Sequence, residues 1–133
     1  MILFVNGSPN REGNTAALAR KLLKGKDYET LNLVDYKIYP LGQQYDDDQY
    51  KEVLRRMQQA DVLVMGLLDS MTGQFRQLLD RLYGADMRSL KGKQLYFIFQ
   101  GAGPSQAMLD AGDYTMRTFC RLAGLEYMGM TSY

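Results

Sequence analysis

The stretch ILFVNGSPNREGNTAALAR, residues 2–20, contains three successive patterns. Residues 2–5 are a short apolar run, which is typical of a buried parallel strand. A polar, glycine-containing segment follows, and residues 15–24 then place apolar side chains at helical spacing. A loop that leaves a buried strand and enters a helix exposes free backbone N–H groups at the positive end of the helix dipole. The stretch therefore predicts a strand, an anion-binding loop and a helix, the first unit of an α/β fold.

The loop between this strand and helix has the chemistry of a phosphate site. Its glycines, Gly7 and Gly13, permit tight turns or close approach of an anion. Five residues separate them and no lysine follows, so the loop is not of the Walker type, and it also lacks the Gly-x-Gly-x-x-Gly dinucleotide pattern. The alternative interpretation is a strand–helix turn that is capped by Asn14 or Thr15 and holds no ligand. Hydroxyl and amide donors come from Ser8, Asn10, Asn14 and Thr15.

The rest of the chain alternates between the two patterns. Further strands are predicted at residues 29–34, 62–65, 95–99 and 125–130, and further helices at 46–60, 71–83 and 106–123. Such alternation predicts a parallel sheet with helices on both faces. Ligands of such sheets bind at the carboxyl ends of the strands, so the loops after the first, third and fourth strands are the candidate site.

The second and third of these loops have weaker signals. In residues 67–73, apolar contact is expected from Leu67, Leu68 and Met71, and hydrogen bonds to the ligand from Ser70 and Thr72. Asp69 is a further candidate binding residue, although Asp69, Ser70 or Thr72 would also suit a helix cap. In the loop after the fourth strand, the alternative is a glycine-rich turn before a helix that starts at Pro104 or Ser105. The candidate binding residues of that loop are Gly101, Ala102, Gly103 and Ser105.

Composition excludes several classes of function. The chain has 133 residues, a net charge of +1, one cysteine and no histidine. The near-neutral charge gives no sign of nucleic-acid or membrane binding, and the lack of histidine excludes Ser-His-Asp and Cys-His catalysis. No apolar run approaches the length of a membrane span, and a single cysteine fits a reducing cytoplasm. Asp46, Asp47 and Asp48 are interpreted as a helix start rather than a metal site, and Cys120 as a core thiol.

Three segments resemble one known family. ILFVNGSPNREGNTAALAR, DDDQYKEVLRRMQQADVLVMG and SMTGQFRQLLDRL are similar, in this order, to segments of the NADPH-dependent FMN reductase family, whose members have a flavodoxin-like fold. The resemblance implies one FMN-binding domain over residues 1–133, with three layers and a five-stranded parallel sheet of order 2-1-3-4-5. It also implies that the FMN phosphate is bound by Ser8, Asn10, Gly13, Asn14 and Thr15.

One segment departs from the family pattern. The family has a Pro-x-Tyr stretch after the third strand, where aromatic and backbone groups surround the flavin ring. This chain reads MGLLDSMTGQ at residues 65–74, with neither proline nor tyrosine, and its second loop is about three residues shorter than the family pattern. We therefore expect FMN to bind through its phosphate and only loosely through its ring.

The predicted function is a flavin-dependent NAD(P)H oxidoreductase. The resemblance implies that FMN accepts hydride from NADPH or NADH and passes electrons to a small acceptor, such as a flavin or a quinone. It also implies a homodimer. Two alternatives remain open at this point: an electron-carrier flavoprotein, which the near-neutral charge disfavours, and a flavin-free binding or regulatory module, which the short second loop favours.

Overall fold

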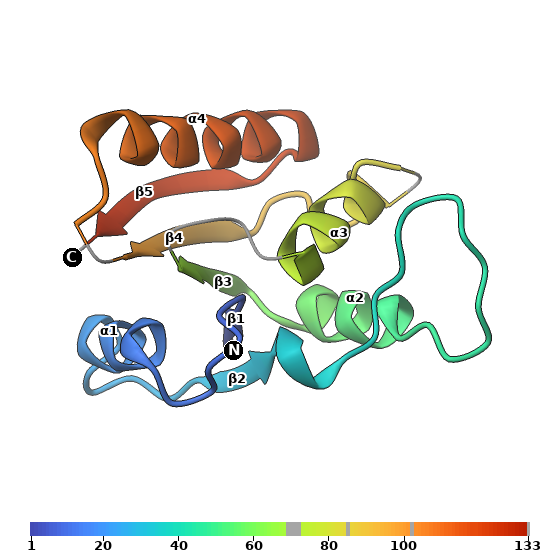
Figure 1. Cartoon of the computed structure of the whole chain (residues 1–133), viewed down its shortest axis with the longest axis horizontal. Helices are drawn as coiled ribbons and strands as arrows, with labels where there is room; N and C mark the ends of the chain where they lie inside the picture. Colours follow the sequence, from blue (N-terminus) through green and yellow to red (C-terminus); the bar gives the residue numbers. More distant parts are fainter. Residues whose placement is uncertain (69–72, 85, 102, 133) are drawn as a thin grey trace.

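The computed structural model describes residues 1–68, 73–84, 86–101 and 103–132. A parallel sheet of order β2-β1-β3-β4-β5 forms its centre (Figure 1), which confirms the predicted flavodoxin-like topology. Its strands are β1 (Ile2–Asn6), β2 (Glu29–Asn32), β3 (Val62–Leu68), β4 (Gln94–Gln100) and β5 (Glu126–Ser132). The helices are α1 (Asn14–Leu22), α2 (Tyr50–Gln59), α3 (Gly73–Leu82) and α4 (Gln106–Ala123), with a short 3-10 helix η1 (Leu33–Asp35).

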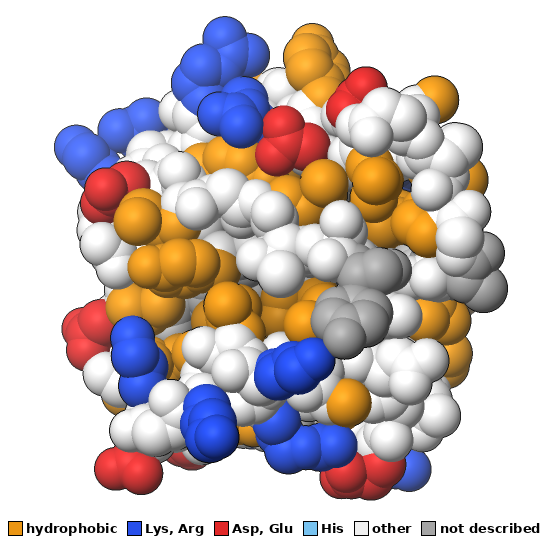
Figure 2. All heavy atoms as spheres, turned by 90° about the vertical axis from the view of Figure 1, so that its left-hand side faces the viewer, with side chains coloured by type: hydrophobic (Ala, Val, Ile, Leu, Met, Phe, Trp, Pro, Cys, Tyr) orange, Lys and Arg blue, Asp and Glu red, His pale blue; other side chains and the backbone are white. Residues whose placement is uncertain are grey.

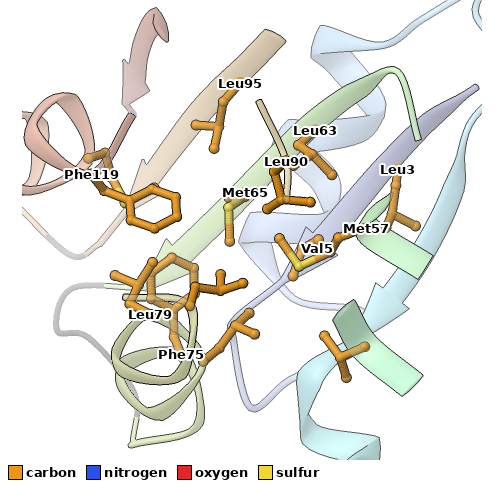
Figure 3. Close-up of a cluster of buried hydrophobic side chains, with 14 of the residues drawn as sticks. Leu3, Val5, Met57, Leu63, Met65, Phe75, Leu79, Leu90, Leu95 and Phe119 are labelled. Carbon is orange, nitrogen blue, oxygen red and sulfur yellow. The ribbon is translucent and has the colours of Figure 1, made fainter. Parts of the chain in front are cut away.

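The alternation of side chains along the strands divides the core into two parts. One face of the sheet, with Leu3 and Met65 among its side chains, packs against α2, α3 and α4 in the larger cluster (Figure 3). The other face packs Phe4, Val64 and Ile98 against α1 alone. Because successive strand residues point to opposite faces, continuous apolar runs are what a sheet covered on both sides requires. α1 is thus the only described helix on its face.

Some element boundaries differ from the predictions. β3 runs three residues beyond the predicted end at Met65, because its last residues pair with β4 in the sheet. The second strand ends at Asn32, and η1 follows it. α2 begins at Tyr50 rather than Asp46, since Asp48 accepts hydrogen bonds from the backbone N–H groups of both Tyr39 and Tyr50, at 3.4 Å each. The aspartates therefore fold the loop before α2 instead of forming its first turn.

Arg81 of α3 holds the long segment 36–49 against the body of the protein. Its guanidinium donates to Asp48 at 2.7 Å and to the carbonyl of Tyr39 at 3.1 Å, and it lies 4.3 Å from the ring centre of Tyr50. Both members of the Arg81–Asp48 pair are only 16% exposed. Burial raises the pKa of Asp48, but the hydrogen bonds from Arg81 and from the backbone of Tyr39 and Tyr50 outweigh it, so the pKa is lowered overall.

We expect Arg81→Ala to lower the free energy of unfolding by roughly 2–3 kcal/mol, somewhat less than for a fully buried ion pair that loses one partner. The stabilisation from Asp48 is present above the ordinary aspartate pKa and is lost as the pH falls through the lowered pKa. The variant should therefore lose less stability than the parent on acidification. Urea unfolding at neutral and acidic pH measures both effects.

Arg20→Ala is the matched control, because Arg20 pairs with Glu12 at 3.3 Å on the surface, where both side chains are more than half exposed. Such pairs contribute about 1 kcal/mol or less. Equal losses of stability in the two variants would contradict the anchoring role of Arg81.

Candidate anion-binding site at the first loop

Asn6, the last residue of β1, organises the loop that follows it. Its side-chain oxygen accepts a hydrogen bond from the backbone N–H of Ser8 at 3.1 Å, and its amide nitrogen donates to the Asn32 side chain at 3.0 Å. Asn6 is fully buried, so these bonds satisfy a polar group that would otherwise be costly there. This role was not predicted from the sequence, although an asparagine directly after a buried apolar run was a usable signal.

The rest of the loop is fixed by its own polar side chains. The Ser8 hydroxyl accepts from the backbone N–H of Asn10 at 3.1 Å, and the Asn10 side-chain oxygen accepts from the N–H of Glu12 at 3.2 Å. The Asn10 side chain also lies over Gly13, where an added Cβ would come within 3.0 Å of it. These bonds use oxygens as acceptors, so the hydroxyl hydrogen of Ser8 and the amide hydrogens of Asn10 are left to donate to a ligand.

The first turn of α1 presents unsatisfied donors. The helix begins at Asn14 after Gly13, and no side chain caps it. The carbonyl of Gly13 accepts from the N–H of Ala17 at 3.0 Å, which closes the first turn. No described hydrogen bond satisfies the N–H groups of Asn14, Thr15 and Ala16. The predicted alternative of a cap by Asn14 or Thr15 is therefore wrong in its choice of residue, because the cap position belongs to Gly13, which has no side chain.

Thr15 supplies the most informative feature of the site. It is fully buried, and its hydroxyl has no hydrogen-bond partner among the residues that the structure describes. Its methyl group lies against β3 at Gly66, where an added Cβ would come within 2.6 Å of it. An unsatisfied buried hydroxyl costs about 1–3 kcal/mol. Together with the free N–H groups of the same helical turn, it forms a site that an anion would complete.

Charged side chains near the loop are already paired. Arg11 forms an ion pair with Asp35 of η1, and Glu12 forms one with Arg20. The hydrogen bond to Asp35 and the negative charge of the Asp35 carboxylate both raise the pKa of Arg11. The positive potential for an anion therefore comes mainly from the helix dipole and the backbone donors of the first turn.

The ends of β3 and β4 lie at the same edge of the sheet as this loop, because β3 pairs in parallel with β1 and β4 pairs in parallel with β3. Leu67 and Leu68 belong to β3 rather than to a loop; Leu67 is buried in the core, whereas Leu68 is 36% exposed. Gly101 follows β4, and Gly103 has the positive φ of +71° that favours glycine. Asp69, Ser70, Met71 and Ala102, which were also predicted to bind, lie outside the described residues.

Ser105 caps α4, because its hydroxyl accepts from the backbone N–H of Met108 at 3.2 Å. The helix therefore begins at Gln106, one residue after the later of the two predicted starts, Pro104 and Ser105. Its part in ligand binding stays a prediction.

A cavity of about 420 Å³ lies beside the anion site, between α1 and the end of β4. Figure 2 shows the side of the molecule where α1 and β5 lie, with hydrophobic side chains exposed among positively charged ones. The cavity is lined by Asn14, Ala17, Leu18, Lys21 and Gln100. Of these, only Asn14 was predicted from the sequence, since nothing local indicated that the surface of α1 would meet the end of β4.

Other polar groups have structural roles. Within the described ranges, no group of histidine, cysteine or acidic side chains could hold a metal ion, and no helix is long and apolar enough to cross a membrane.

Asp47 accepts hydrogen bonds from the Lys37 ammonium group at 3.0 Å and from the Tyr39 hydroxyl at 2.8 Å. Burial raises the pKa of the Cys120 thiol to about 12, which fits the predicted core thiol.

Comparison with known proteins agrees with this arrangement. The sequence model of the NADPH-dependent FMN reductase family matches residues 1–130. No curated protein matches the sequence significantly. Among solved structures, the Trp repressor binding protein from Bacillus subtilis is 22% identical, with a TM-score of 0.79 over 99% of this chain and 85% of that one.

Two further structures share the fold. An NADH:FMN oxidoreductase in its apo form is 24% identical, with a TM-score of 0.70 over 99% of this chain and 73% of that one. The two-electron reduced flavodoxin of Megasphaera elsdenii is 18% identical, with a TM-score of 0.61 over 99% of this chain and 85% of that one. At these identities the likeness is one of fold.

Proposed function

Because this chain belongs to the NADPH-dependent FMN reductase family, we propose that it is a flavin-dependent NAD(P)H oxidoreductase whose first loop binds the FMN phosphate. The observation that carries the proposal is the buried hydroxyl of Thr15, which no described residue pairs, in a helical turn that no side chain caps. A phosphate there would accept from that hydroxyl and from the first backbone N–H groups of α1. One phosphate dianion would thus accept hydrogen bonds from donors that lower the stability of the protein when no ligand is bound.

The residues of this chain would position the cofactor rather than perform acid–base chemistry. FMN, when bound, supplies the hydride-accepting ring. Ser8, Asn10, Gly13, Asn14 and Thr15 would hold its phosphate, and the exposed Leu68 would offer apolar contact near the end of β3. In the third loop the backbone N–H group of Gly101 would face developing negative charge on the reduced ring, whereas that of Gly103 donates to the Gly101 carbonyl at 3.2 Å. The absence of histidine from the sequence is compatible with such a mechanism.

The proposal includes an electron donor, NADPH or NADH, and a small acceptor, a flavin or a quinone. Membership of the family supports a flavin-dependent oxidoreductase in general. We also propose a homodimer and a cytoplasmic protein. Anaerobic bleaching of the flavin by NADPH distinguishes a reductase from an electron carrier, because a pure carrier has no reaction with the nicotinamide.

Comparison of FMN with riboflavin tests the proposed function directly. We expect FMN to bind the purified protein at least about tenfold more tightly, because one charge-assisted hydrogen bond contributes about 1.5–3 kcal/mol and riboflavin has no phosphate. Titration monitored by flavin fluorescence measures both dissociation constants. Equal affinities would mean that the ring drives binding, and no binding of either compound would favour a flavin-free module.

A further inference from the structure

The cavity beside α1 and the candidate phosphate site share one residue, Asn14. Four residues of α1 line the cavity. Counted from Asn14, the other three lie three, four and seven positions further along the helix, so the four form one stripe: Asn14, Ala17, Leu18 and Lys21. This stripe extends about 10 Å from the first turn of α1, at 1.5 Å per residue. Asn14 is both the first residue of the helix and a wall of the cavity. A ligand with a phosphate on the first turn could therefore extend into the cavity.

The chemistry of the cavity walls is that of a nucleobase site. Gln100 is only 8% exposed, yet no described hydrogen bond involves its side-chain amide. A carboxamide can pair with the edge of adenine through one donated and one accepted hydrogen bond. The side chains of Ala17 and Leu18 are apolar and suit the face of a planar ring. The volume of about 420 Å³ lies within the range of small-molecule sites, about 300–1,000 Å³.

From these observations we infer that the site takes a flavin dinucleotide, with the adenosine half in the cavity between α1 and β4. The inference rests on the proposed function, because the flavin phosphate occupies the first loop in both. A second phosphate joined to the first would lie at the same helix N-terminus, and the adenine would pair with Gln100. The adenosine contacts would also compensate for the short second loop, which gives the flavin ring little support.

Parallel titrations with FAD and FMN test the inference. We expect FAD to bind at least ten times more tightly than FMN. Ala17→Leu would fill the cavity, and Gln100→Leu would remove the carboxamide at similar volume. Each variant should reduce the affinity for FAD to near that for FMN and leave the affinity for FMN unchanged. Ala111→Leu, the same change at an exposed position of α4, is the matched control and should alter neither affinity.

Each outcome bears on one of the two proposals. Tight FMN binding with no advantage for FAD would overturn the dinucleotide inference and leave the proposed function intact. No binding of either flavin would overturn the proposed function itself. An equal loss of FMN and FAD affinity in Gln100→Leu would show that Gln100 contacts the flavin half, and this result would also overturn the inference. Circular dichroism of each variant separates such effects from loss of the fold.

Discussion

Replacement of Thr15 by valine is expected to weaken FMN binding by about 10- to 150-fold and to leave the apo protein equally stable or more stable. The hydroxyl of Thr15 is buried and has no partner in the described part of the chain, so its removal eliminates a desolvation cost of about 1–3 kcal/mol from the empty protein. In the complex, the same hydroxyl would donate a hydrogen bond to the phosphate. The loss of such a charge-assisted bond costs about 1.5–3 kcal/mol, which corresponds to the expected 10- to 150-fold loss of FMN affinity. Valine keeps the shape of the side chain and the methyl contact with Gly66.

The two effects of Thr15→Val are measured separately. Flavin titration gives the affinity, and urea unfolding of the apo protein gives the stability. Thr115→Val is the matched control, because the Thr115 hydroxyl donates to the carbonyl of Ala111 at 2.9 Å within α4, far along the chain from the first loop. A purely structural role for Thr15 would appear as a less stable apo protein with unchanged FMN affinity, and this result would contradict the proposed site.

Replacement of Gly7 by alanine is expected to destabilise the fold by about 3 kcal/mol or more, at the upper end of the range for overpacked cores. An added Cβ would lie 2.8 Å from the carbonyl oxygen of Gly66 and 2.9 Å from the ring of Phe75. The same carbonyl accepts the backbone N–H of Gly7 at 2.8 Å, so the loop and β3 are already in direct contact. Because a backbone atom cannot move away as a flexible side chain can, the loop itself must shift.

Thermal and urea unfolding measure the effect of Gly7→Ala. Gly73→Ala provides the control, because an added Cβ at this position of α3 meets no described atom within 4 Å. At such a position alanine stabilises by about 0.4–1 kcal/mol through the unfolded state. If Gly7→Ala folds as stably as Gly73→Ala, the close approach of the first loop to β3 is wrong. A folded Gly7→Ala protein with reduced FMN affinity would show instead that the loop moved.

Local sequence signals were sufficient for much of the fold. The predicted bounds of α4, residues 106–123, agree with the structure, because Ser105 caps its start and Gly124 adopts a positive φ of +78° at its end. The alternation of apolar runs and helical stripes was enough to predict a parallel sheet. The order of its strands followed from the resemblance of the first loop and the two later segments to one family. Each of these features depends on residues that are close in the sequence.

The features that complete the candidate site depend on residues that are far apart in the sequence. Thr15 resembles an ordinary helix cap until β3, about fifty residues later, buries it against Gly66. Its hydroxyl then has no partner within the described ranges. Asp48 resembles a helix start until Arg81 of α3 pairs with it. The cavity forms only where α1 meets the end of β4 at Gln100. The sequence alone thus determined which loop we propose as the anion site. Burial and long-range contacts decided which hydrogen-bond donors of that loop have no described partner, because the desolvation of a group depends on every element that packs around it.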